Sequence, residues 1–176
     1  MRNVYLCCRK YCIVVKMSKW RVDPSKCLGC LIEEGKLDAS AFSLLLTKHF
    51  MVNQNFEVPI PGFYIISTRR HIFSVDEFTE EECAEFARIL KLIRQGMREA
   101  LDVKIVYLFQ NEAGNSHFHL WIFPRLEWME KFGANVESVH NIINYAKANM
   151  RTKETFEQAK ISLDKMEQFV QKNWRT

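Results

Sequence analysis

Two histidines separated by one residue offer the clearest chemistry in this sequence. His117 and His119 stand in the run Ser-His-Phe-His-Leu-Trp-Ile-Phe-Pro, between residues 116 and 124. In a strand, alternate side chains share a face, which would place the two imidazoles about 7 Å apart. Imidazole is a usual side chain for proton transfer and for nucleophilic attack on phosphorus near neutral pH. The pattern also fits two incidental histidines on a half-exposed strand, so the choice between a reactive and an incidental pair depends on the rest of the chain.

A pair of cysteines supplies the second group of reactive side chains. Cys27 and Cys30 lie in the turn-rich segment Asp-Pro-Ser-Lys-Cys-Leu-Gly-Cys. In a chain from a reducing compartment, a Cys-x-x-Cys pair is typical of half a zinc site or of a redox motif, or it can be incidental. The redox interpretation requires a thioredoxin-like βαβ pattern around the pair, and no such pattern follows.

The elements that would position these residues are a set of strands around one long helix. Residues 50–56, 63–68, 104–110 and 117–123 have strand character, and the turn at 111–115 makes the last two an antiparallel pair. Phe118, Leu120 and Ile122 form an apolar face that would pack on the core. Thr79 and Glu82 predict a capping box that begins a helix reaching about Leu101. Residues 39–47 fit either a strand or a short helix, and 136–150 and 152–173 have helical spacing.

Length and composition indicate one globular domain. The chain has 176 residues, of which 48% are hydrophobic and 26% charged, and no apolar run is long enough to span a membrane. The net charge of +4 is too small to indicate a nucleic-acid-binding protein by itself. Six cysteines without a convincing signal peptide favour the cytoplasm. We expect residues 1–16 to be an unstructured or wrongly assigned extension, with Met17 as an alternative start.

The order of these motifs resembles the histidine triad (HIT) superfamily of nucleotide hydrolases and transferases, in its zinc-containing branch. The matching positions are the Cys27–Cys30 pair, Pro-Gly at 61–62, Arg-His at 70–71, the long helix, the polar turn at 111–116 and the His-x-His strand. The resemblance implies an α+β fold, with an antiparallel sheet of about five strands, one long packed helix and a helical C-terminal extension. The expected division is 17–128 for the HIT-like domain and 129–176 for the extension packed on it.

The resemblance also implies a role for each matching residue. His119 would be the nucleophile that forms a phosphohistidine intermediate with a nucleoside monophosphate. Structural zinc would be held by two thiolates and two imidazoles, a sound tetrahedral ligand set. The predicted ligands are Cys27, Cys30, His71 and His117. The predicted nucleotide-binding residues are Asn55 at the ribose, the turn residues Asn111, Gly114, Asn115 and Ser116 at the phosphate, and Arg125 after the motif.

One position departs from the family pattern. Trp121 replaces the third histidine, which is thought to assist the leaving group, and an indole N–H can donate a hydrogen bond but cannot shuttle a proton. Even with this departure, the leading hypothesis from the resemblance is an enzyme that cleaves a nucleoside monophosphate from a dinucleoside polyphosphate or a phosphoramidate. The alternative is a zinc-stabilised module that binds a nucleotide or a protein with little turnover. A homodimer is expected, with a purine mononucleotide or dinucleoside polyphosphate as ligand and without membrane or sequence-specific nucleic-acid binding.

Overall fold

The computed structural model describes residues 4–8, 11–15, 27–112 and 117–174. Residues 1–16 were expected to be an unstructured or wrongly assigned extension, but β1 (Val4–Cys8) and β2 (Tyr11–Val15) within it form an antiparallel two-stranded sheet of their own. None of the helices in these ranges has the length and apolar character needed to cross a membrane.

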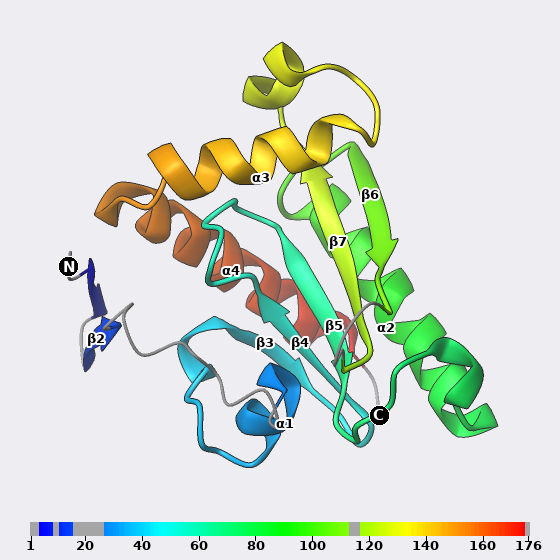
Figure 1. Cartoon of the computed structure of the whole chain (residues 1–176). Coiled ribbons are helices and arrows are strands. Elements are labelled where there is room, and N and C mark those ends of the chain that lie inside the picture. Colours follow the sequence, from blue (N-terminus) through cyan, green and yellow to red (C-terminus); the bar gives the residue numbers. More distant parts are fainter. Residues whose placement is uncertain (1–3, 9–10, 16–26, 113–116, 175–176) are drawn as a thin grey trace.

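The main sheet has five antiparallel strands in the order β3-β4-β5-β7-β6 (Figure 1). Its strands are β3 (Ser43–Leu46), β4 (Phe50–Gln54), β5 (Tyr64–Thr68), β6 (Ile105–Gln110) and β7 (His119–Arg125). This architecture confirms the predicted α+β fold with about five strands. The segment 39–47, left open by the sequence, is a short 3₁₀ turn, η2 (Ser40–Phe42), followed by β3.

The two longest helices begin where threonine side chains cap their first turns. The long helix α2 (Glu80–Glu99) has the predicted capping box, in which Thr79 accepts from the Glu82 N–H and Glu82 bonds back to the Thr79 N–H. The other helical segments are α1 (Leu28–Glu33), η3 (Val75–Glu77), η4 (Glu127–Phe132), α3 (Ser138–Asn149) and α4 (Lys153–Asn173). Thr152 caps α4 by accepting from the Thr155 N–H.

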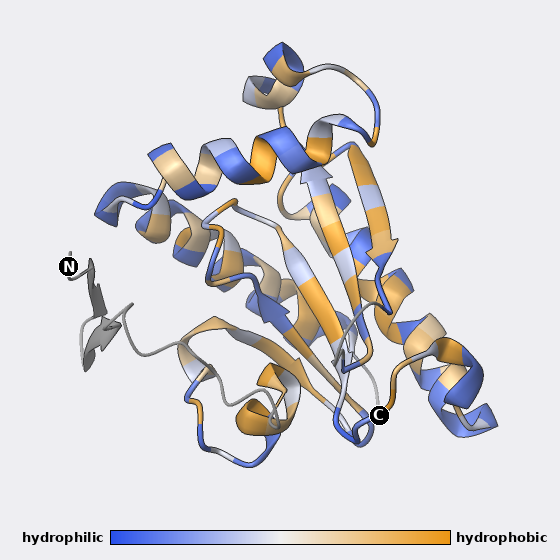
Figure 2. Ribbon diagram, in the orientation of Figure 1, coloured by the Kyte–Doolittle hydropathy of each residue, from blue (hydrophilic) through white to orange (hydrophobic). Residues whose placement is uncertain are grey.

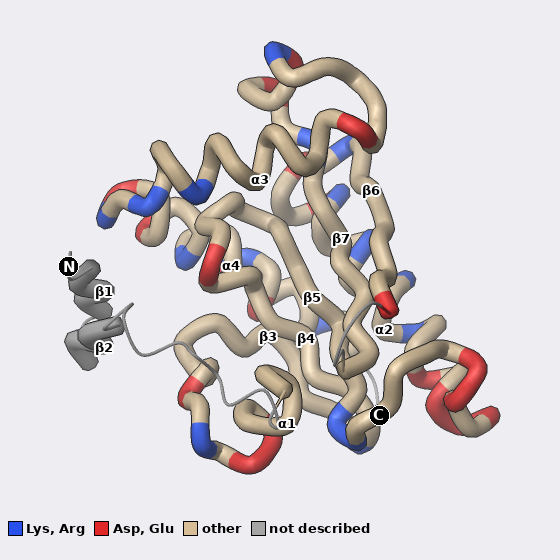
Figure 3. The backbone as a smooth tube through the Cα atoms, viewed as in Figure 1, with Lys and Arg blue, Asp and Glu red and all other residues tan. Residues whose placement is uncertain are grey.

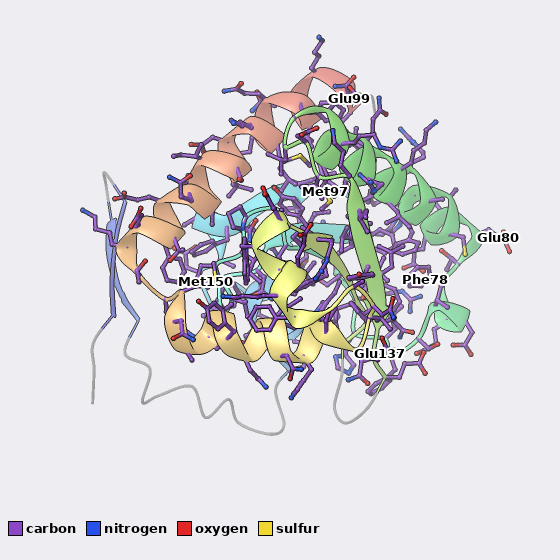
Figure 4. All side chains as sticks on the ribbon, turned by 90° about the horizontal axis from the view of Figure 1, so that it is seen from above. Phe78, Glu80, Met97, Glu99, Glu137 and Met150 are labelled. Carbon is purple, nitrogen blue, oxygen red and sulfur yellow. The ribbon has the colours of Figure 1, made fainter. Side chains whose placement is uncertain are left out.

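One face of the sheet packs against α2 and α4. Its buried side chains include Tyr64, Ile66 and Ile122 from the strands, and they meet Ile93 of α2 and Met166 of α4 in one apolar cluster. Viewed from above, α2 and α4 lie on the same side of the sheet (Figure 4). From the predicted apolar face of the histidine strand, Ile122 lies in this core and Leu120 packs against it, while Phe118 is 2% exposed and contacts Phe78 and Phe86.

The opposite face is covered at one end by α3, which crosses the sheet between Glu137 and Met150 (Figures 1 and 4). A second apolar cluster forms there from Phe63, Phe123 and Met129 with Val139 and Ile142 of α3. The two C-terminal helices thus pack on opposite faces of the sheet, and the sheet is the middle layer of three.

The middle of that opposite face is not sealed. Ile65 lies at the centre of β5, the central strand, yet it is partly exposed, as are His119 and Trp121 on the neighbouring strand. The strands are largely apolar, and the acidic and basic residues lie mostly on helices and loops around them (Figures 2 and 3). The fold therefore leaves a weakly charged strip of sheet open beside His119.

The close approach of α2 and α4 depends on a glycine. A Cβ atom built on Gly96 would lie 2.7 Å from Cδ1 of Phe169 and 2.8 Å from Cε of Met166. We predict that Gly96→Val forces the two helices apart and lowers the free energy of unfolding by about 1–3 kcal/mol. Thermal melts should show this loss, whereas Lys91→Val, at an exposed position of α2, should change the melting temperature little. Equal melts for the two variants would contradict the packing argument.

Candidate metal centre and histidine pair

The cysteine pair sits at the start of α1. Cys27 is the N-cap residue, and its Sγ accepts a hydrogen bond from the Cys30 N–H at 3.2 Å. The helix returns the chain within one turn, so the two Sγ atoms lie 2.8 Å apart as free thiols. Burial, followed by the hydrogen bond with Cys27, raises the pKa of Cys30 to about 11. A cation that binds here has to displace thiol protons, so its affinity must fall with falling pH.

Two histidines complete this cluster: His71 follows the end of β5, and His117 precedes the start of β7. Nδ1 of His71 is 3.2 Å from each Sγ, and Nδ1 of His117 is 3.4 and 3.6 Å from the Sγ atoms of Cys27 and Cys30. The four ligand atoms all lie within 4.8 Å of one another. Bonds of about 2.0–2.3 Å give a tetrahedron with edges of roughly 3.3–3.8 Å, close to most of these separations. The predicted ligands therefore form a metal-binding cluster whose donor atoms suit zinc.

His117 is held for metal binding by its second nitrogen. Its Nε2–H donates to the backbone carbonyl of Thr68 at 2.6 Å, which directs the lone pair of Nδ1 toward the cysteines. Burial lowers the pKa of His117, which favours the neutral ring that a metal ligand requires. This buried hydrogen bond fixes both the tautomer and the orientation of the ring.

Two consecutive arginines anchor the segment that carries His71. Arg69 binds Glu33 of α1 through Nε and Nη2, at 2.9 and 2.6 Å. Arg70 binds Glu82 of α2 through Nε and Nη2, at 2.6 and 2.8 Å. The end of β5 is therefore tied to the cysteine helix on one side and to the long helix on the other.

His119 is oriented by the backbone of the neighbouring metal-cluster histidine. Its Nδ1–H donates to the carbonyl oxygen of His117 at 2.8 Å, and the side chain is partly exposed. Because Nδ1 carries the proton in this bond, the lone pair of the neutral ring is on Nε2. The arrangement presents an unprotonated nitrogen for proton acceptance or nucleophilic attack.

Trp121 lies beside the His119 ring. Its ring centroid is 6.1 Å from that of His119 and 5.4 Å from that of Phe63, which it meets edge to face. The indole also borders the apolar cluster under α3. Trp121 is thus fixed by packing on the same face as His119, at the position where the resemblance implied a third histidine.

The remaining predicted nucleotide-binding residues lie in three settings. Oδ1 of Asn55 accepts from the N–H groups of Glu57 and Val58, each at 2.9 Å, so this oxygen organises the β4–β5 loop. Arg125 donates to the carbonyls of Met129 and Gly133, which ties down η4. Asn111 is exposed just after β6, and Gly114, Asn115 and Ser116 lie outside the described residues. Their roles in nucleotide binding stay predictions.

Residues that the sequence did not single out also surround the histidines. Thr68 provides the carbonyl that holds His117, and Ser67 pairs directly with His119 across the β5–β7 ladder. The sequence signal for Ser67 was a polar residue within the mostly apolar predicted strand of residues 63–68. It could be used only once the strand register was known, because register decides which residues are neighbours.

The metal cluster generates a direct prediction. Cys30→Ser should remove a ligand, lower the bound metal well below one ion per chain and reduce the melting temperature by roughly 5–10 °C through loss of binding linkage. Cys83→Ser, the same change at an exposed thiol of α2, is the matched control. Metal content by atomic spectrometry and thermal melts check both. Retention of metal by the Cys30 variant would contradict the assignment.

The Arg70–Glu82 pair predicts a pH dependence of stability. The Arg70 hydrogen bonds lower the pKa of the buried Glu82 carboxyl from about 4.5 to about 2. A lowered folded-state pKa stabilises the protein above the unfolded pKa, and this stabilisation is lost as the pH falls from about 4.5 to about 2. Glu82→Gln should therefore reduce unfolding free energy by about 1–3 kcal/mol at pH 7. The difference from the native protein should shrink between pH 4.5 and pH 2 in urea titrations; a constant difference would contradict the coupling.

Known proteins resemble this chain both in sequence and in structure. No family model matches the sequence. A galactose-1-phosphate uridylyltransferase from Thermotoga maritima is 30% identical over 128 residues, covering 64% of this chain and 40% of that protein, so the chain spans less than half of the relative's length.

Solved structures give the wider match. A zinc-bound histidine triad family protein from Mycobacterium smegmatis has a TM-score of 0.54 at 16% identity, covering 82% of this chain and 98% of that one. A hypothetical histidine triad nucleotide-binding protein from Sulfolobus tokodaii has a TM-score of 0.58 at 18% identity, covering 84% and 96%. The chain has the fold of the histidine triad proteins.

Proposed function

We propose that this chain is a nucleotide hydrolase or nucleotidyltransferase that works through a covalent intermediate on His119. The observation that carries the proposal is the hydrogen bond from His119 Nδ1 to the His117 carbonyl, which leaves the Nε2 lone pair for attack. The fold shared with a nucleotide-binding protein and the sequence similarity to a uridylyltransferase support the same chemistry.

The reaction has two displacements at phosphorus. The Nε2 lone pair of His119 attacks the phosphorus of the nucleoside monophosphate group, an N–P bond forms, and the P–O or P–N bond to the leaving group breaks with its electron pair. Water or a phosphate oxygen of an acceptor then attacks the same phosphorus. The N–P bond breaks and its electron pair returns to Nε2, while the proton of attacking water passes to solvent. The His117 carbonyl keeps Nδ1 protonated throughout and stabilises the positive charge on the phosphorylated ring.

Trp121 limits which leaving groups suit this site. An amine must gain a proton as it departs, and the indole cannot transfer one. A polyphosphate or sugar-phosphate oxygen leaves as an anion and needs only hydrogen-bond stabilisation. We therefore propose dinucleoside polyphosphates or nucleoside diphosphate sugars as better donors than phosphoramidates.

The metal cluster has a structural role in this proposal. Cys27, Cys30, His71 and His117 would hold zinc, whose donor set they match. The ion would supply cross-linking between α1, the end of β5 and the start of the histidine strand. With all four positions taken by protein ligands, such a site is closed to substrate, so the reacting groups come from the chain itself.

A homodimer fits the exposed edge of the sheet. β6 is an edge strand, and Ile105 and Leu108 on it are 55% and 50% exposed. An apolar edge strand with unpaired backbone groups is suited to pairing with another copy. We propose this dimer in the reducing environment of the cytoplasm, where the cysteine cluster would keep its thiols.

The binding-module alternative makes a different prediction from the enzyme. Trp121 would then fill the catalytic position with a group that cannot transfer protons, so nucleotides would bind without turnover. Catalysis that depends on His119 separates the two functions.

The decisive experiment is intact-protein mass spectrometry after brief incubation with a diadenosine polyphosphate, an adenosine phosphoramidate or a UDP-hexose. We expect a transient mass increase of one nucleoside monophosphate together with product. Both should be absent in His119→Ala and retained in His140→Ala, which removes an exposed imidazole on α3. Native spectra of the same samples report the oligomeric state.

Two outcomes would overturn the enzymatic proposal. An adduct or product that persists in His119→Ala would place the chemistry elsewhere. Nucleotide binding without adduct or product for any donor would favour the binding module instead.

A further inference from the structure

Two buried polar side chains share the sheet face of His119 and Trp121. In the ladder, His119 pairs with Ser67 and Trp121 pairs with Ile65, which in turn pairs with Asn53 of β4. Directly paired residues project from the same face, and their Cβ atoms lie about 4.5–5.5 Å apart. Ser67 is therefore the immediate neighbour of His119, while Asn53 lies two strands away on the same open strip.

Neither side chain has a partner among the residues that the structure describes. Asn53 and Ser67 are only 7% and 8% exposed, and within residues 27–112 and 117–174 neither side chain makes a hydrogen bond or other polar contact. The adjacent Gln54 and Asn55 are, by contrast, bonded within the β4–β5 loop. A mostly buried polar side chain without a protein partner is available to a ligand that can hydrogen-bond it.

Both groups remain within reach of a ligand. The hydroxyl of Tyr64, on the other face of the same strand, is sealed from solvent, whereas the Asn53 and Ser67 polar atoms are not. They flank Ile65, which is itself partly exposed at the centre of the sheet. Their residual exposure therefore opens onto the strip beside His119.

The strip beside His119 offers neutral hydrogen-bonding groups to a ligand. β4 and β5 contain no Asp, Glu, Lys or Arg, and the one charged residue of β7, Arg125, is bonded to two backbone carbonyls. A serine hydroxyl and a carboxamide can each donate and accept. They can hydrogen-bond phosphoryl oxygens and the hydroxyl or base groups of a nucleoside, and they offer no charge that would attract a cation.

We propose that Ser67 and Asn53 are substrate-contacting residues of the His119 site. Ser67 donates to a non-bridging oxygen of the phosphoryl group at His119, and Asn53 hydrogen-bonds the nucleoside attached to it. Strand spacings put the Cα atoms of His119 and Asn53 roughly 12 Å apart, a separation that a nucleoside monophosphate and two side chains span. The inference rests on the proposed function for the identity of the ligand.

The test measures binding and stability in the same variants. Dissociation constants for UMP, AMP, uridine and adenosine are measured by calorimetry on the metal-loaded protein. Ser67→Ala should weaken the monophosphates about 5–10-fold, the loss of roughly one hydrogen bond, and leave the nucleosides unaffected. Asn53→Leu, which keeps the side-chain shape, should weaken monophosphates and nucleosides alike.

Thermal melts without ligand separate a binding role from a structural one. Since both groups lack partners in the described part of the chain, the two variants should melt at or above the native temperature. Ser138→Ala is the matched control, because Ser138 is a 5% exposed serine whose Oγ donates to the Asn135 carbonyl at 2.6 Å. It should lose stability and keep nucleotide affinity.

Each result has a defined meaning. Unchanged affinities, a loss of stability like that of Ser138→Ala, or a native protein that binds none of the four probes would overturn the inference. A native protein that binds monophosphates through both residues but forms no adduct on His119 would overturn the proposed function and support this inference. An adduct formed equally by the native protein and Ser67→Ala, with equal affinities, would overturn the inference alone.

Discussion

His117 is bound through three different polar atoms, and the arrangement of the site depends on them. Its Nδ1 faces the two thiols, its Nε2 donates to the Thr68 carbonyl, and its own carbonyl accepts from His119. A single residue therefore joins the cysteine helix, the end of the central strand and the proposed nucleophile. Because each contact constrains a different part of the residue, the cysteine cluster and the ring of His119 are linked through His117 without any direct contact between them.

The surrounding fold supports this residue by ion pairs and by two apolar cores. Arg69 and Arg70 tie the segment before His71 to α1 and α2, while α2 with α4, and α3 on the far side, hold the sheet between them. The helix α3 covers only one end of its face of the sheet, which leaves the strip around Ile65, His119 and Trp121 partly exposed. Rigidity around the histidines and access beside them thus come from the same three-layer arrangement.

Much of this could be predicted from local sequence patterns. The capping box at Thr79, the antiparallel pairing around residues 111–115 and the four metal ligands required only spacing and residue type, together with the family resemblance. The position of Ser67 and Asn53 on the face of His119 could not be predicted, because a neighbour relation across three strands depends on register, which local sequence determines poorly. The engagement of Arg125 with η4 was equally hidden, since an arginine after a strand can bind a phosphate or a carbonyl and only tertiary contacts distinguish the two.

The glycine inside the cysteine pair adds a steric constraint to these polar ones. A Cβ atom on Gly29 would lie 2.7 Å from Cγ of the His117 ring, closer than side chains tolerate. The backbone of α1 therefore lies directly against the imidazole, and this contact confines the ring sterically in addition to its hydrogen bond. A methyl group at position 29 would clash with the ring even though every predicted metal ligand and hydrogen-bonding group remained in the sequence. The residue between the two cysteines is therefore restricted in size, whereas the cysteines are restricted by the chemistry of their thiols.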